Sequence, residues 1–414
     1  MKRIGVLYSY ELKKIVNRKL VWIVGTIIVL LCGFLSFSDL IGSTYYFEDK
    51  DVSGYEAMKI NREYARNLNR RKIDDSLLQE MQASFPKETD GKIISNNSMS
   101  GIQTAIVTDD SQGDELERGI TEYTPIYSYV QAIMENSNSA LEIDANDLYS
   151  EREKSISQNH TVQMLTEKET DYWEKKAAQI KTPFTYEYTE GWGDLWEYAY
   201  TINYMVLLVL AICLSNVFSV EHLRKTDAII LCSRHGRRDL YIAKILAGMT
   251  FGVVIAVLCF GITAISSICI YGADGFNVAV QLAFPLSSWN ITVGESVLIL
   301  LIELVIISIL YSITIMVLSE ILKNSIAVMA IPVGIMIFTM MIDIPYQFRV
   351  PSQIYDLLPT NLLIKWNLWD DRLVSIFGKY LINFQIAPII YLIITIILFF
   401  VGKKVYLKYQ IGAR

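Results

Sequence analysis

The sequence predicts a mainly α-helical, polytopic membrane protein. We expect six transmembrane helices, an N-terminal interfacial helix, and a large, mainly helical extracytoplasmic domain between the first two spans. Hydrophobic residues make up 52% of the 414 residues, and the mean hydropathy is +0.32. Charged residues account for only 19%, against about 25% in an ordinary soluble domain. A soluble core cannot bury so much apolar surface in a chain of this length, so the lipid bilayer is the predicted solvent.

Six stretches with few or no charges have the length of about 20 residues that a helix needs to cross the hydrocarbon core. The predicted spans are residues 20–38, 198–220, 245–273, 294–319, 324–342 and 380–402. The segments outside them are an interfacial helix at 1–19, the extracytoplasmic domain at 39–197, a cytoplasmic loop at 221–244, an external segment at 343–379 and a cytoplasmic tail at 403–414. The first stretch is too long for a signal-peptide core and lacks a cleavage site, which favours a retained anchor.

Lysine and arginine residues near the ends of the spans predict the orientation of the chain. They cluster in residues 1–19, 221–244 and 403–414, which share one side when six helices alternate. We therefore expect a multi-pass protein of the plasma membrane with both termini in the cytoplasm. The first 19 residues also place Ile4, Leu7 and Ile15 near one helical face, which predicts a helix lying on the membrane surface. Ordinary positive-inside flanking is the alternative for this segment.

The segment between the first two spans is acidic, because residues 39–199 carry 31 acidic and 16 basic side chains. Helical spacing of apolar residues, helix starts at Thr124-Pro125 and Asp144, and a stop at Pro183 predict helices over 55–85, from 124, from 144 and over 162–180. Residues 86–119 are rich in Asn, Ser, Asp and Gly and are predicted to be loop. None of the five cysteines lies in this block, which favours a bacterial cell without reliance on extracellular disulfides. The domain either faces a substrate or partner or only supports the helices.

Polar residues inside the predicted spans are candidate functional residues, because a carboxylate in hydrocarbon is costly unless it faces protein or water. Glu303 lies well inside the fourth span, and Glu295 lies two helical turns before it. Asn203 and Asn216 lie in the second span. We expect these four residues to line a translocation pathway or a dimer seam. The alternatives are a packing hydrogen bond or, for Glu295, simple interfacial placement.

Several chemical functions have no support in the sequence. There is no P-loop, no His-Glu-x-x-His and no Gly-x-Ser-x-Gly, and only three histidines are present. No basic tract is interleaved with aromatic residues as a nucleic-acid site would require. We therefore predict that the chain is not an enzyme, binds no metal or cofactor, and does not bind nucleic acid.

The connection between the second and third spans carries a short apolar helix between basic residues, which could dock in a groove of a cytoplasmic partner. Glu221 ends the second span, Thr-x-x-x-Ile-Leu-x-Ser follows at 226–233, and Arg238 and Lys244 lead into the third span. This pattern resembles the coupling region of type-2 ATP-binding-cassette (ABC) exporter permeases. The resemblance covers about 250 residues of the membrane part and leaves out the acidic block.

The resemblance implies how this chain would work. The residues that match the coupling region, or add cations to it, are Glu221, Thr226, Leu231, Ser233, Arg234, Arg237, Arg238 and Lys244. The partners would be two copies of a cytoplasmic ATPase that binds the ATP, a second permease copy or homologue, and membrane lipids. Residues 1–19 would form an elbow helix, and residues 343–379 would form short re-entrant helices.

The predicted function is export of an amphipathic substrate, namely a peptide, lipid or drug, with immunity to an antimicrobial peptide as one use. The alternative function is a membrane sensor or scaffold whose outer domain binds a peptide or envelope component without transport. An intramembrane enzyme is a third option, but it lacks a recognisable nucleophile or metal set.

Overall fold

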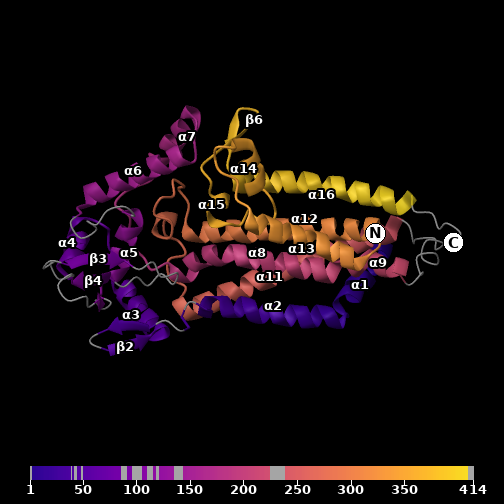
Figure 1. Ribbon diagram of the computed structural model, residues 1–414, viewed down its shortest axis with the longest axis horizontal. Helices are drawn as coiled ribbons and strands as arrows, with labels where there is room; N and C mark the ends of the chain where they lie inside the picture. Colours follow the sequence, from indigo (N-terminus) through magenta and orange to yellow (C-terminus); the bar gives the residue numbers. More distant parts are fainter. Residues whose placement is uncertain are drawn as a thin grey trace. The chain divides into compact units, whose positions relative to one another are not determined.

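The computed structural model describes residues 2–38, 40–41, 44–47, 50–84, 91–95, 105–109, 115–117, 121–134, 143–223 and 238–408 (Figure 1). The chain divides into two compact units, which are described separately. The first unit comprises Met1–Cys32, Glu197–Ile262 and Ile299–Arg414. The second unit comprises Gly33–Trp196 and Thr263–Leu298.

Among the described residues, five helices are long and apolar enough to cross a membrane. They are α2 (Lys19–Ser38), the span Glu190–Glu221 formed by α8 (Glu190–Leu214) and most of α9 (Asn216–Leu223), α11 (Arg238–Tyr271), α12 (Val293–Leu322) and α16 (Asn383–Lys408). The remaining predicted span corresponds to α13 (Ser325–Met341), whose 17 residues lie at the lower end of the range of about 17–25 for a spanning helix. The chain is therefore a mainly α-helical, multi-pass membrane protein, and the count of six spans stays a prediction.

The predicted helix at the N-terminus is α1 (Lys2–Val16). Its Ile15 is buried, and the Tyr8 hydroxyl donates to Thr250 Oγ1 of α11 at 3.1 Å. Helix α1 ends at Val16, and α2 begins at Lys19. A helix therefore occupies most of residues 1–19, and its position at the membrane surface stays a prediction.

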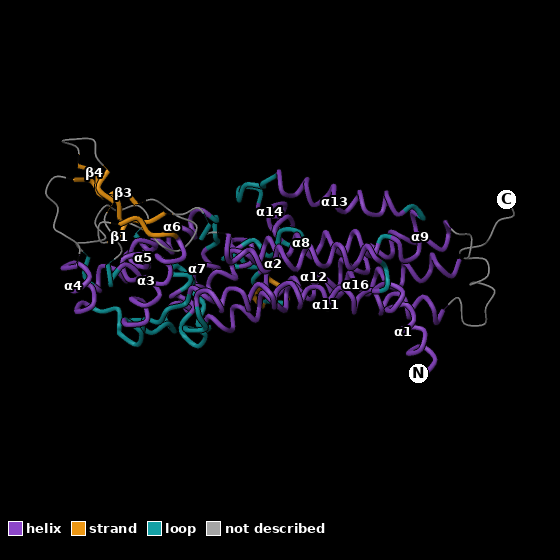
Figure 2. Tube along the Cα trace, turned by 90° about the horizontal axis from the view of Figure 1, so that it is seen from below, coloured by secondary structure: helices purple, strands orange, loops and turns teal. Residues whose placement is uncertain are grey.

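Helices α11 and α12 of the first unit pack closely at small residues. A Cβ atom on Gly248 would lie 2.3 Å from Met316 Sδ, and one on Gly252 would lie 2.2 Å from Ser312 Oγ. Glycines four residues apart allow such a close approach of two helices in a membrane. Figure 2 shows that α8, α11, α12 and α16 extend along the same direction.

Among its described residues, the second unit contains five α-helices outside the long apolar ones, the short 3-10 helix η1 (Val280–Leu282) and two small sheets. The helices are α3 (Gly54–Asn67), α4 (Asp75–Ser84), α5 (Thr124–Ile133), α6 (Ala145–Val162) and α7 (Glu167–Ala177) (Figure 1). The sheets are the hairpin β1 (Thr44–Phe47) and β2 (Lys50–Ser53), and the antiparallel sheet β3 (Gly91–Ser95), β4 (Ala105–Asp109) and β5 (Glu115–Glu117). The hydrophobic core of the second unit includes Leu77, Leu78, Ile126, Val130 and Leu148.

Capping explains where several of these helices begin. Ser53 and Glu56 form a capping box at α3, and the Asp144 side chain caps α6 as predicted. A further capping box at Thr166 starts α7, so the predicted helix over 162–180 is instead the end of α6 and a separate α7. At α5, the cap position is Tyr123 rather than Thr124, and Pro125 lies in the first turn.

Two further predictions for the second unit were wrong. The predicted helix over 55–85 is two helices, because Arg70 N–H and Ile73 N–H donate instead to the carbonyls of Tyr186 and Phe184. The predicted loop over 86–119 contains strands β3, β4 and β5. These strands include the β-branched runs Ile93-Ile94 and Ile106-Val107, which favour extended backbone more than the polar flanks indicate.

Candidate functional site

The residues next to the predicted coupling connection lie at a break between two helices. A single residue, Ser215, separates helix α8 (Glu190–Leu214) from helix α9 (Asn216–Leu223). The Ser319 hydroxyl of α12 donates to the Ser215 carbonyl at 2.6 Å and accepts the Ser219 N–H at 3.0 Å. A side chain of a neighbouring helix thus satisfies backbone groups that the break leaves without helical partners. Asn216 is half-buried at the first position of α9.

Glu221 near the end of α9 and Lys244 of α11 form a buried ion pair. Lys244 Nζ lies 2.6 Å from Glu221 Oε2, and the two residues are 0% and 6% exposed. The same ammonium donates to the Val217 carbonyl at 3.2 Å and lies 4.7 Å from the centroid of the Phe218 ring. Two of the residues that sequence reasoning assigned to the coupling region therefore meet, although 23 positions separate them.

A second cation completes this group, which we call the Glu221 cluster (Lys14, Glu221 and Lys244). Lys14 Nζ of α1 lies 3.0 Å from Glu221 Oε1 and 3.3 Å from Glu11 Oε1. Burial lowers the pKa of the Lys14 ammonium, but Glu221 and Glu11 together raise it above its ordinary value. The cluster ties α1, α9 and α11 together on both sides of the connection at residues 224–237.

The structure brings together only part of the predicted coupling set. Thr226, Leu231, Ser233, Arg234 and Arg237 lie outside the described residues. Arg238 is exposed at the first position of α11. The role of all these residues in ATPase coupling stays a prediction.

The predicted pathway residues occupy different surroundings. Glu303 of α12 is 2% exposed, and its Oε2 has no hydrogen-bond partner among the described residues. Glu295 is exposed and forms a capping box with Thr292, whose N–H donates to its carboxylate at 2.8 Å. Asn203 is buried, and its amide donates to the Pro359 carbonyl at 2.8 Å. Capping and packing account for the positions of Glu295 and Asn203, whereas no contact of this kind accounts for Glu303.

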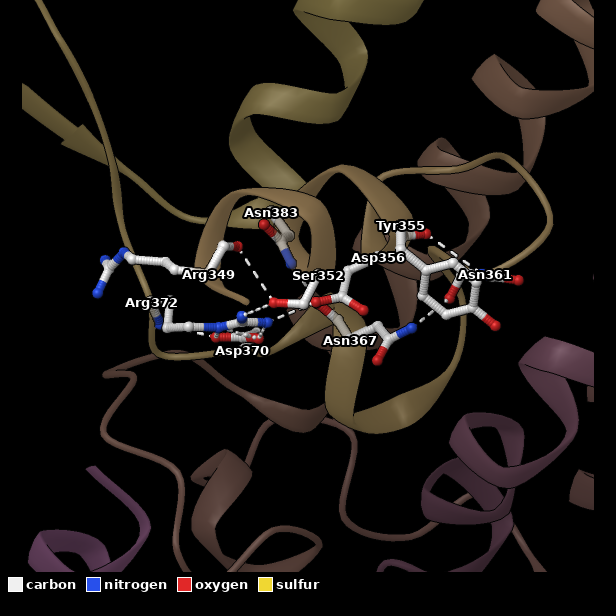
Figure 3. Close-up of polar contacts among 9 residues, drawn as sticks. All are labelled: Arg349, Ser352, Tyr355, Asp356, Asn361, Asn367, Asp370, Arg372 and Asn383. Atoms are coloured by element: carbon white, nitrogen blue, oxygen red, sulfur yellow. Dashed lines mark hydrogen bonds and ion pairs between the residues drawn. The ribbon is translucent and has the colours of Figure 1, made fainter. Parts of the chain in front are cut away.

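A second buried ion cluster lies in the segment of the chain that connects α13 to α16, where the sequence predicted short helices. This segment contains α14 (Arg349–Asp356), α15 (Lys365–Leu368), and the hairpin of β6 (Val374–Ile376) and β7 (Lys379–Leu381). The Arg372 guanidinium, 0% exposed, lies 2.5 Å from Asp356 Oδ2 and donates through Nε to the Asp370 carboxylate at 2.8 Å (Figure 3). It also donates to the Ser352 hydroxyl.

We call these four residues the Arg372 cluster (Ser352, Asp356, Asp370 and Arg372). Asparagine amides form a second set of hydrogen bonds in the same segment, in which Asn367 donates to the Asn361 carbonyl at 3.2 Å and Asn383 donates to the Asn367 carbonyl at 2.7 Å (Figure 3). Burial raises the pKa of Asp356 to about 7, with repulsion from Asp370 adding to the rise and Arg372 opposing it. Sequence reasoning missed this cluster, although Asp370-Asp371-Arg372 within an otherwise apolar stretch was a visible signal.

Comparison with known proteins identifies the family of the chain. A family model described as ABC-2 family transporter protein matches residues 6–362, which include both the Glu221 cluster and the acidic second unit. No curated protein and no solved structure matches the chain. This family supplies membrane components of transport and works with an ATP-binding subunit. The chain therefore belongs to the ABC-2 family of transporter proteins, as a membrane permease subunit.

Proposed function

We propose that this permease exports an amphipathic peptide, lipid or drug across the plasma membrane of a bacterium. Two copies of a cytoplasmic ATPase drive the cycle, and a second permease copy or homologue completes the pathway. Both termini lie in the cytoplasm. Self-protection against an antimicrobial peptide is one use of such export. The Glu221 cluster carries this proposal, because it locks the two helices that enter and leave the predicted coupling connection.

The physical argument concerns how a pull on residues 224–237 would spread. The ion pair of Glu221 with Lys244 makes α9 and the start of α11 move together, since separating buried opposite charges is costly. The break at Ser215 lets α9 tilt against α8, while Ser319 links that break to α12. Motion of the ATPase would therefore reach α12 as a rigid-body shift of packed helices.

The composition of this bundle supports the proposal of an amphipathic substrate. Glu303 offers a buried carboxylate among apolar residues of α12, which suits a substrate with both a polar or cationic group and an apolar part. Helix α13 exposes apolar side chains that suit either lipid or the second permease, namely Ile326, Ile331, Ile335 and Phe338.

The decisive experiment is co-expression with the ATPase encoded beside this permease, followed by co-purification and ATP-driven peptide uptake into inside-out vesicles. We expect a stable complex, and we expect the double reversal Arg237→Glu and Arg238→Glu to reduce complex formation and uptake at least tenfold. The matched control is Lys404→Glu with Lys408→Glu, which makes the same charge change on α16, the helix that leads into the predicted cytoplasmic tail. It should leave both measurements within twofold of the unaltered protein.

Two outcomes of this experiment would contradict the proposal. If no complex forms with the neighbouring ATPase, the export proposal loses its basis and the sensor or scaffold function is favoured instead. If both double reversals weaken the complex equally, general surface charge rather than the 221–244 connection is responsible.

A further inference from the structure

The segment that connects α13 to α16 exposes apolar side chains that the transport proposal does not use. Helix α14 shows this clearly, because its two faces are reversed relative to those of a helix in water. Ser352 and Asp356 are buried against Arg372, whereas Val350 and Ile354 are exposed. A helix at the surface of a soluble domain buries its apolar stripe and exposes its polar face. The reversed arrangement indicates that an apolar medium surrounds this segment.

The hairpin of β6 and β7 extends from this segment with a fixed base and a bare tip. Leu373 before β6 and Ile382 after β7 are both buried, and antiparallel pairing joins the two strands between them. Phe377 and Gly378 form the turn at the tip. Phe377 is 102% exposed, so no described residue covers its ring. The hairpin therefore presents an aromatic side chain that contributes nothing to the core of the first unit.

The backbone at the tip is strained by the residue that it carries. The φ angles of Phe377 and Gly378 are +50° and +78°, so both turn residues have left-handed backbone, as in a type I′ turn. Such turns favour Asn-Gly, whereas a bulky residue at positive φ is an outlier. The phenyl ring thus stabilises neither the turn nor a core. This combination of strain and full exposure indicates a contact outside the chain.

The surroundings of the tip point to lipid as that contact. Lys379 is exposed two residues after Phe377, and Trp366 of α15 is exposed in the same segment. Exposed aromatic rings and a cation beside the end of a spanning helix are typical of the membrane–water interface. Strands of three residues rise about 10 Å, and each interfacial layer of a bilayer is about 5–8 Å thick. Because these lengths are comparable, a hairpin near the beginning of α16 reaches the lipid headgroups (Figure 1).

We propose that the β6–β7 hairpin is a lipid anchor that ties the beginning of α16 to the surface of the bilayer. The Phe377 ring inserts at the boundary between headgroups and acyl chains, and the Lys379 ammonium pairs with a lipid phosphate. The exposed apolar face of α14 lies in the same boundary. Since the buried Arg372 lies two residues before β6, the anchor also fixes the Arg372 cluster relative to the membrane.

The test is photo-crosslinking of the full chain in lipid nanodiscs without nucleotide, so it is independent of the export proposal. The photoreactive amino acid p-benzoylphenylalanine replaces Phe377, and mass spectrometry identifies what it captures. We expect lipid adducts in nanodiscs of phosphatidylcholine mixed with phosphatidylglycerol. The matched control carries the same amino acid at Lys154, which is exposed on α6 in the predicted extracytoplasmic domain. Its yield of lipid adducts should be at least tenfold lower.

Further substitutions separate lipid contact from a structural role. Lys379→Glu should lower the yield of lipid adducts at position 377 at least threefold, because a carboxylate repels lipid phosphate. Lys181→Glu, at an exposed lysine of the second unit, should leave that yield within twofold. Phe377→Asn should not lower the unfolding temperature in detergent, since asparagine suits this turn. In Phe377→Trp, brominated lipid chains should quench the fluorescence of the added indole, but not that of Lys154→Trp.

Any of three results would overturn the proposal. The first is capture of a second permease copy in place of lipid, which would assign the tip to a protein interface. The second is an equal yield of lipid adducts at positions 377 and 154, which would make the reaction a matter of exposure alone. The third is a lower unfolding temperature in Phe377→Asn, which would give the ring a structural role. If the crosslinking variant does not fold, the quenching of Phe377→Trp decides.

Discussion

The two ion clusters of the first unit have opposite compositions. In the Glu221 cluster one carboxylate lies between two ammonium groups, whereas in the Arg372 cluster one guanidinium lies between two carboxylates. The exposure of the charged side chains also differs. The Lys14 side chain is 46% exposed, whereas those of Asp356 and Asp370 are 10% and 1% exposed.

This difference indicates different mechanical roles. The Glu221 cluster can exchange Lys14 for water and still keep its carboxylate paired with Lys244, so α1 can move while α9 and α11 stay locked together. The Arg372 cluster has no solvated partner to release, because every charge in it is buried. We infer that it holds α14 and the β6–β7 hairpin rigid while the Glu221 cluster accommodates motion. The predictions below test this contrast.

The largest effect is expected for Arg372→Met. The substitution leaves two buried carboxylates without a cation, which typically costs about 3–5 kcal/mol of stability. Chemical unfolding of the purified protein in detergent measures the loss. Lys365→Met is the control, since it breaks a more exposed pair with Glu197 and should cost about 1 kcal/mol or less. Equal losses in the two variants would show that burial does not distinguish them.

Lys244→Met should have the next largest effect. It removes the buried partner of Glu221 but leaves Lys14 in place, so the loss should be about 2–3 kcal/mol, below that of Arg372→Met. The double variant Glu221→Gln with Lys244→Met should lose less than the sum of the single losses, because the two residues interact directly. Additive losses in this cycle would contradict the ion pair.

The pH dependence of stability should follow Asp356. An unfolded Asp ionises near pH 3.9, whereas in the folded protein the pKa of Asp356 is about 7. The folded state therefore binds the proton more tightly, and this stabilisation is complete below about pH 3.9 and lost as pH rises through 7. Between pH 5 and 8 we expect a loss of roughly 1–2 kcal/mol, reduced by partial solvent screening. Thermal unfolding measures it, and Asp356→Asn should remove this part of the slope while leaving the part that comes from Asp371, whose pKa burial raises to about 8. A profile unchanged by that substitution would exclude Asp356 as the source.

Lys14→Met should have the smallest effect, under about 1 kcal/mol, because partly exposed pairs contribute little and are screened by salt. Unfolding at low and high ionic strength separates the two lysines. The difference between Lys14→Met and the unaltered protein should shrink at high salt, whereas that for Lys244→Met should persist. A salt-independent loss at Lys14 would make both clusters equally rigid.

Much of the fold follows from local sequence patterns. Long apolar runs predicted the spanning helices, and Asp144 predicted the start of α6. These signals are readable because helix formation and burial in lipid depend on residues within a few turns of one another. The start of α16 shows the limit, because residues 380 and 381 belong to the predicted span 380–402 but lie in strand β7, which pairs with residues 374–376.

The sequence by itself predicted a membrane permease, which the family match confirms, and it predicted that Glu221 and Lys244 belong to a coupling connection. Only the tertiary structure decided that these two residues form a buried pair, that Glu295 caps α12, and that Arg372 gathers its two aspartates. The physical reason is that a charge or a hydrogen-bonding atom acts through space over a few ångströms. Its partners are chosen by how helices dock, and neither periodicity nor composition records that choice.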